Sequence, residues 1–223
     1  MMEQILQPRI TENKDWVTLL FVLTFAVIAF AKSVNENRFR DFMNLLFSDK
    51  YAKVYRENSN QKSTFTIALF LAQLLSFSFF IQLALSIFGL ASKTDWLLFI
   101  QISTFTTFFV LAKYLLEKIV ATAFNIEDFV EHFNLQKVNY RTYIGLFLLP
   151  INILLFYYNQ FSTKFVLITT VIVLALNTLT YIMAIKKYHT IIFSKLFYFI
   201  LYLCTLEITP YFFIYYWFTK GSD

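Results

Sequence analysis

The chain has 223 residues, of which 58% are hydrophobic, 21% aromatic and only 15% charged, with a net charge of +5. A soluble domain has about 25% charged residues, so this composition excludes an ordinary soluble fold, and its hydrophobicity excludes disorder. Three glycines, three prolines and one cysteine exclude collagen-like proteins, Gly-rich phosphate loops and a disulfide framework. The composition therefore predicts an all-α, polytopic membrane protein.

Six apolar stretches qualify as helices that cross a bilayer, which takes about 20 residues each, and the first and fourth are short enough to need flanking residues. The first stretch contains the A-x-A arrangement of a signal-peptide cleavage site at Ala29–Ala31, but its leader is acidic rather than basic, so we interpret it as a span. The sequence predicts one integral-membrane domain over residues 1–223. Its predicted spans are Trp16–Ala31, Phe65–Leu90, Trp96–Leu116, Tyr143–Tyr158, Phe165–Ile185 and Phe197–Trp217.

Lysine and arginine are concentrated in the loops that follow the first, third and fifth predicted spans. Because cytoplasmic loops carry an excess of these residues, we expect those loops in the cytoplasm and both termini on the outer, periplasmic side. The net positive charge then indicates contact with anionic lipid headgroups rather than with nucleic acid.

Two polar stretches predict amphipathic helices that lie in the membrane surface on the cytoplasmic side. Apolar residues of Arg38–Tyr51 fall on one helical face, and the same spacing recurs between the third and fourth spans. These helices either only pack under the bundle or also dock a cytoplasmic partner, and both interpretations stay open. The residues predicted to make these contacts are Phe39, Phe42, Met43, Leu46, Phe47, Phe129 and Phe133.

The chain contains no HExxH, GxSxG or CxxC motif, so we expect neither an enzyme nor a cofactor. Asp128, Glu131, His132 and His189 are the nearest approach to a metal-binding set. Acidic residues beside one histidine usually form a solvated face, so no metal site is predicted. Cys204 is expected to be a small buried hydrophobe.

Glu207 lies at the centre of the last predicted span, where a carboxylate costs at least ~2.5 kcal/mol to insert. Pro210, three residues later, predicts a helix kink beside it. Counting 1.5 Å per residue, Asn152, Asn177 and Gln73 come within about one helical turn of the level of Glu207. The sequence thus predicts a midplane polar cluster of these four side chains.

This cluster has two interpretations. It either holds the helices together through hydrogen bonds, or it forms a proton- or substrate-coupled site in which Glu207 titrates. Lys113 is expected to extend toward the headgroups, which leaves Glu207 neutral and hydrogen-bonded to amides. A lone acid without a relay partner favours the structural interpretation.

Two segments carry a resemblance to a family. YLCTLEITP at Tyr202–Pro210, and the Tyr-Arg, Gly145 and Pro-x-Asn pattern within Asn139–Tyr158, resemble an uncharacterised integral-membrane family of Bacteroidota that is known only as a domain of unknown function. The resemblance extends from about Asp15 to Trp217 and includes RFRDF at Arg38–Phe42. It implies a protein of the cytoplasmic (inner) membrane of a Gram-negative bacterium, and it implies no activity.

We therefore expect an accessory or scaffold subunit of an inner-membrane envelope complex that acts by binding other membrane proteins in a hetero-complex. By elimination, protein export is the process expected for that complex. The alternative is a small proton-coupled transporter that uses Glu207 as its titrating group.

Overall fold

A computed structural model describes residues 14–45, 51, 54–55, 63–123, 127–158, 163–187 and 216. Within these residues the regular structure is helical: α1 (Asp15–Val34), α2 (Glu36–Met43), α5 (Thr64–Ile87), α6 (Trp96–Ala123), α7 (Glu127–Tyr157) and α8 (Thr163–Lys187). Five helices of the described part are long and apolar enough to cross a membrane. The expected all-α membrane-type fold is confirmed at that level. The sixth predicted span, Phe197–Trp217, lies outside the described residues apart from residue 216.

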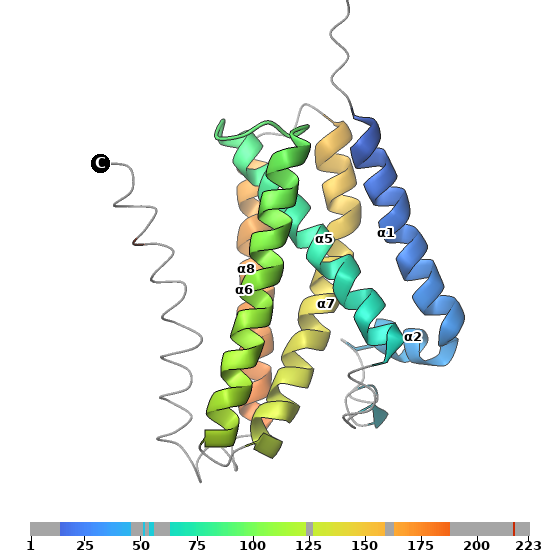
Figure 1. The fold of residues 1–223 in the computed structure, drawn as a ribbon, viewed down its shortest axis with the longest axis vertical. Helices are drawn as coiled ribbons and strands as arrows, with labels where there is room; N and C mark the ends of the chain where they lie inside the picture. Colours follow the sequence, from blue (N-terminus) through green and yellow to red (C-terminus); the bar gives the residue numbers. More distant parts are fainter. Residues whose placement is uncertain are drawn as a thin grey trace, which may run out of the picture.

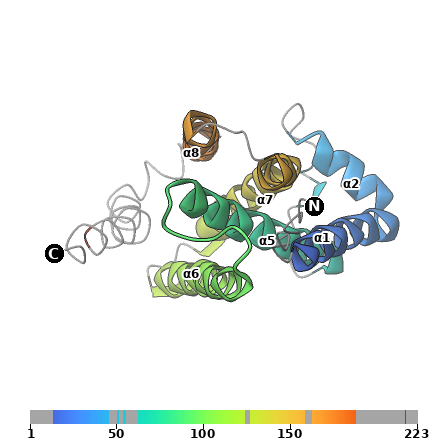
Figure 2. The same ribbon diagram turned by 90° about the horizontal axis from the view of Figure 1, so that it is seen from above.

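Helix α5 occupies the centre of the bundle and crosses it obliquely, with α1, α6 and α7 packed around it (Figures 1 and 2). Helix α8 packs mainly against α7. The composition of α5 fits this central position. Leu, Phe, Ala and Ser cover the whole circumference of the helix and leave no wide polar face. A helix that is apolar all round is stable only when its neighbours or lipid surround it.

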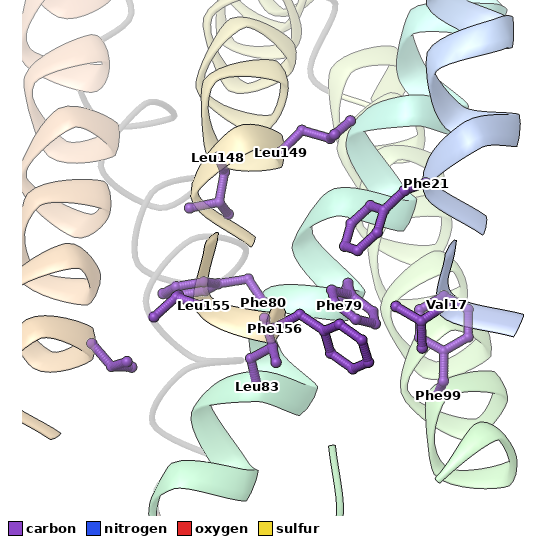
Figure 3. Close-up of a cluster of buried hydrophobic side chains, with 11 residues drawn as sticks. Val17, Phe21, Phe79, Phe80, Leu83, Phe99, Leu148, Leu149, Leu155 and Phe156 are labelled. Atoms are coloured by element: carbon purple, nitrogen blue, oxygen red, sulfur yellow. The ribbon is translucent and has the colours of Figure 1, made fainter. Parts of the chain in front are cut away.

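The largest cluster of buried apolar residues draws on α1, α5, α6, α7 and α8, and Phe79 of α5 contacts rings from three of its neighbours (Figure 3). The ring centroid of Phe79 lies 4.9 Å from that of Phe21 on α1, 6.0 Å from Phe99 on α6 and 5.7 Å from Phe156 on α7. Edge-to-face and tilted ring pairs of this kind contribute about 0.5–1.5 kcal/mol each beyond the area that they bury. Phe79 therefore joins α1, α6 and α7 to the central helix.

The turn between α5 and α6 begins where the helix meets a glycine. Gly89 has φ of +75°, a conformation that other residues rarely adopt. Its N–H donates to the Ser86 carbonyl and the Leu90 N–H donates to the Leu85 carbonyl, both at 3.0 Å. These two bonds satisfy the last carbonyls of α5, so the helix ends at Ile87 and the predicted span, which was extended to Leu90, was slightly too long.

The helices alternate in direction, which gives the bundle two ends (Figure 1). We call the end that holds the α5–α6 turn the turn end. There the Trp16 indole donates to the Thr94 carbonyl at 3.1 Å, and the hydroxyls of Thr18 and Tyr157 lie 2.6 Å apart. The opposite end, where α2 lies, is the α2 end.

The second predicted surface helix is wrong in one respect. Helix α7 runs without a break from Glu127 to Tyr157, so the predicted interfacial helix and the fourth span are one element. At 1.5 Å per residue its 31 residues extend for about 46 Å, well beyond a hydrocarbon layer about 30 Å thick. The first predicted surface helix is also shorter than expected, since α2 ends at Met43 rather than Tyr51.

Candidate functional site

Two of the predicted midplane residues lie in one interface, between α5 and α7. Gln73 of α5 is buried, and its side-chain carbonyl accepts a hydrogen bond of 2.7 Å from the Thr142 hydroxyl of α7. Asn152 of α7 is also buried, and its amide nitrogen donates to the Ser76 carbonyl at 2.8 Å and to the Ser76 hydroxyl at 3.3 Å. Both residues therefore join the same two helices, but through different partners.

A glycine allows these helices to come close together. A Cβ atom added to Gly145 would lie 2.8 Å from Cγ and 3.2 Å from Cα of Gln73. Contacts this short leave no room for any other residue without movement of α5 or α7. Small residues have the same role at close helix crossings in membranes. Gly145 thus places the Gln73 amide within reach of Thr142.

Some buried side-chain oxygens on α5 and α7 have no partner among the described residues. The side-chain oxygens of Asn152 and Ser78 are buried, and neither makes a hydrogen bond within the described part of the chain. Asn152 follows Pro150, which lies inside α7 and lacks the N–H that would bond to the Leu146 carbonyl. The α5–α7 interface therefore combines paired polar groups with unused hydrogen-bonding capacity.

The other predicted cluster residues do not add to this interface. Asn177 of α8 donates to the Val173 carbonyl of its own helix at 2.9 Å. Its amide nitrogen therefore satisfies a group on α8 rather than joining two helices. Glu207 and Pro210 lie outside the described residues, so the predicted contact between Glu207 and the amides stays a prediction.

Lys113 is buried, and its predicted extension toward the headgroups stays a prediction. Four residues later on α6, the Glu117 carboxylate accepts a bond of 2.6 Å from the Lys137 ammonium of α7, and both side chains are buried. Sequence reasoning missed this ion pair. The available signal was Glu117 itself, a carboxylate directly after the apolar run Trp96–Leu116 that needs a cationic partner when it is buried.

At the α2 end, Arg38 attaches α2 to the start of α5, another contact that sequence reasoning missed. Its side chain is only 7% exposed. The guanidinium donates to the hydroxyls of Ser63 at 2.7 Å and Thr66 at 2.9 Å, and it lies 4.8 Å and 4.9 Å from the ring centroids of Phe65 and Tyr55. Such stacking stabilises a buried cation by about 2 kcal/mol when it is desolvated.

Tyr51 completes this arrangement. Its hydroxyl accepts a bond of 3.4 Å from Nε of Arg38, and its ring packs against Phe42. Burial raises the pKa of the Tyr51 hydroxyl above its ordinary value of 10.0, and the neighbouring Arg38 charge only partly offsets that rise. Tyr51 is therefore held as a neutral phenol that supports the packing of α2.

The residues predicted for partner contact have different positions. Phe42 is buried against Phe65 and Tyr143, Phe39 is half-buried, and Met43 is exposed. Packing in the bundle thus uses Phe42 and leaves Met43 at the surface of α2. Phe129 and Phe133 belong to the first two turns of α7, but their side chains are not described, and Leu46 and Phe47 lie outside the described residues.

One face of α6 points away from the other described helices. Along this face every third or fourth residue is exposed, and we call this row the α6 outer stripe. It comprises Leu97, Gln101, Thr104, Phe108, Leu111 and Leu115. Among the described residues, none donates to or accepts from the side chains of Gln101 and Thr104. By contrast, the hydroxyls of Thr24 and Thr178 donate to carbonyls four residues back in their own helices.

Among the described residues, no group of three or more His, Cys, Asp or Glu side chains is arranged to hold a metal ion. Of the four residues considered for a metal site, His189 lies outside the described residues, and the side chains of Asp128, Glu131 and His132 are not described either. The buried polar groups described above are therefore amides, hydroxyls, the Arg38 guanidinium, Lys113 and the Glu117–Lys137 ion pair.

Comparison with known families gives one match, to the family described as "Domain of unknown function (DUF4271)", over residues 17–218. The chain belongs to the DUF4271 family. The match covers nearly all of the chain, including both segments on which the resemblance was based. Neither the curated proteins nor the solved structures gave a match. The DUF4271 membership confirms an uncharacterised family and supplies no activity.

Proposed function

We propose that this DUF4271 protein is an integral-membrane subunit that acts by binding other membrane proteins. The observation that carries the proposal is the exposed Gln101 amide on the α6 outer stripe. Gln101 is five residues after Trp96, about 8 Å along the helix from its start, and therefore within the apolar part of α6.

The cost of exposing this amide to lipid supports the proposal. A polar group in hydrocarbon without a hydrogen-bond partner costs on the order of 2 kcal/mol or more. Thr104, one turn later on the same stripe, adds a hydroxyl that also faces outward. A second transmembrane helix that covers the stripe would bury both groups and offer them partners, whereas lipid tails offer none.

The proposed location is the inner membrane of a Gram-negative bacterium, as a member of an envelope complex, with protein export as the leading process. The charge distribution supports an orientation in which the α2 end faces the cytoplasm, because most of the 19 lysines and arginines lie in the loops assigned to that side. Exposed Met43 on α2 is then available to a cytoplasmic or membrane-surface partner.

Affinity purification in a mild detergent, followed by mass spectrometry, tests this function. We expect the wild type to be recovered in a stoichiometric complex, whether with an unlike membrane protein or with a second copy of itself, and Gln101→Leu to lose part of that complex while folding normally. Thr178→Val is the matched control, because it removes an exposed hydroxyl from α8 that is already bonded to its own helix. Recovery of a monomer without a stoichiometric companion would contradict the proposal.

Proton-coupled transport is the second candidate, and two observations favour it. The Glu117–Lys137 pair is a buried ionisable pair, and the Asn152 side-chain oxygen is a buried acceptor without a partner. Ionisable groups inside membrane helices frequently belong to proton pathways. The test is growth or proton-flux measurement with Glu207→Gln and Glu117→Gln. Wild-type behaviour at normal protein levels in both variants would dismiss this candidate.

A further inference from the structure

The α6 outer stripe has the spacing of a helix-pairing surface. From Leu97 to Leu115 its residues alternate at intervals of four and three positions, so that each successive pair of intervals spans the seven residues of a heptad. That repeat keeps one row of side chains facing a partner helix when two helices cross at a small left-handed angle. The stripe extends for about 27 Å along α6, nearly the thickness of the hydrocarbon layer.

The opposite face of α6 is already used inside the bundle. Phe99, Lys113 and Glu117 are buried there, against α5 and α7. Phe99 and Glu117 each differ from the nearest stripe residue by two positions, which is about 200° around the helix. The stripe is therefore directed away from the bundle over its whole length, so a partner could reach it without displacing any described helix.

The polar groups of the stripe are complementary to themselves. The Gln101 amide carries two donors and one acceptor, so two such amides can exchange hydrogen bonds with each other. The stripe contains no charged residue that would repel an identical stripe. Two copies of the chain inserted in the same direction and related by a two-fold axis would bring residue 101 opposite residue 101.

We propose that two copies of this chain associate through their α6 outer stripes, in parallel, with paired Gln101 amides at the two-fold axis. The inference rests on the proposed function, because it names the partner that covers the stripe. A second copy fits better than an unlike protein, since a neutral amide flanked by leucine and phenylalanine matches itself and carries no charge pattern that would select a different partner.

Cysteine crosslinking in native membranes tests the pairing. In a Cys204→Ala background, Gln101→Cys and Phe108→Cys introduce single thiols on the stripe. Leu19→Cys on α1 and Leu174→Cys on α8 are matched controls, because both leucines are exposed on other helices. Mild oxidation should yield a disulfide-linked dimer of the chain from the stripe positions and not from the controls.

A second measurement isolates the amide. Two differently tagged copies are co-expressed, and the fraction recovered together is compared for wild type, Gln101→Leu and Gln101→Asn. Loss of one or two interhelical hydrogen bonds at about 0.6 kcal/mol each should lower the dimer-to-monomer ratio about three- to eightfold in Gln101→Leu. Gln101→Asn retains an amide and should restore part of the association.

The outcomes separate the inference from the function on which it rests. Crosslinks from the stripe positions to an unlike protein would overturn the pairing of copies and leave the proposed function standing. Equal dimer yields from stripe and control positions would overturn the pairing as well. Absence of any crosslink at the stripe, together with purification of a lone monomer, would overturn both.

Discussion

Gly145 of α7 lies against Gln73 of α5, so close that a Cβ atom on residue 145 would be 2.8 Å from Cγ of Gln73. This contact sets the separation of the two most buried long helices, because Gln73 is also fixed by its bond to Thr142. The close crossing of α5 and α7 therefore depends on one missing side chain.

Enlarging Gly145 should destabilise the bundle. Overpacking typically costs about 1–3 kcal/mol, while replacing glycine with alanine in a helix returns up to about 1 kcal/mol. We expect Gly145→Ala to lower the thermal midpoint in detergent modestly and Gly145→Leu to lower it strongly. Ala175→Val adds bulk at an exposed position of α8 and is the control. A wild-type midpoint for Gly145→Leu would show that the helices do not approach as described.

The Glu117–Lys137 pair should behave as a coupled unit. Removing one partner of a buried pair leaves an uncompensated charge and costs about 3–5 kcal/mol, whereas replacing both with apolar residues is often close to neutral. We expect Lys137→Met and Glu117→Leu each to be strongly destabilised and the double variant to recover most of that loss. A double-mutant cycle in detergent measures this, and additive losses would contradict a direct contact.

Tyr51 should make stability depend on alkaline pH. Burial raises its pKa above 10.0 in the folded chain, so the folded state binds this proton more tightly than the unfolded state. The resulting stabilisation is complete below the unfolded pKa and is lost as pH rises through the folded one. Above about pH 10 the wild type should therefore lose stability more steeply than Tyr51→Phe.

Tyr114→Phe, which removes an exposed hydroxyl from α6, is the matched control for this measurement. It should follow the wild-type pH profile. Identical alkaline profiles for the wild type and Tyr51→Phe would show that Tyr51 is not buried beside Arg38.

The length of each apolar run predicted most helices of the described chain to within a few residues. A long apolar segment is costly to expose to water, so the run itself indicates where such a helix lies. It failed at the end of α6 and the start of α7, where charged residues continue the helices. There Glu117 and Lys137 neutralise each other across 20 positions of sequence, which local hydropathy does not reveal. The first turns of α7 were consequently assigned to a separate surface helix.

The depth of each residue along the membrane normal predicted that Gln73 and Asn152 lie close together. Depth alone could not identify their hydrogen-bond partners, Thr142 and Ser76. Partner choice depends on the rotation of each helix about its axis, and depth carries no information on rotation. The same limit explains Asn177, which has a suitable depth but bonds within α8. The burial of Arg38 and the outward direction of Gln101 likewise follow only from the packing of helices distant in sequence.

We expect the helices to cross a bilayer with the α2 end in the cytoplasm, and cysteine accessibility tests this arrangement most directly. In a Cys204→Ala background, single cysteines replace Asn37 at the α2 end, Lys93 at the turn end and Leu23 within α1. Intact cells are treated with a membrane-impermeant maleimide. We expect Lys93→Cys to be labelled from outside, Asn37→Cys only after the membrane is opened, and Leu23→Cys in neither case. Labelling of Asn37→Cys and Lys93→Cys from the same side, or ready labelling of Leu23→Cys, would contradict the claim.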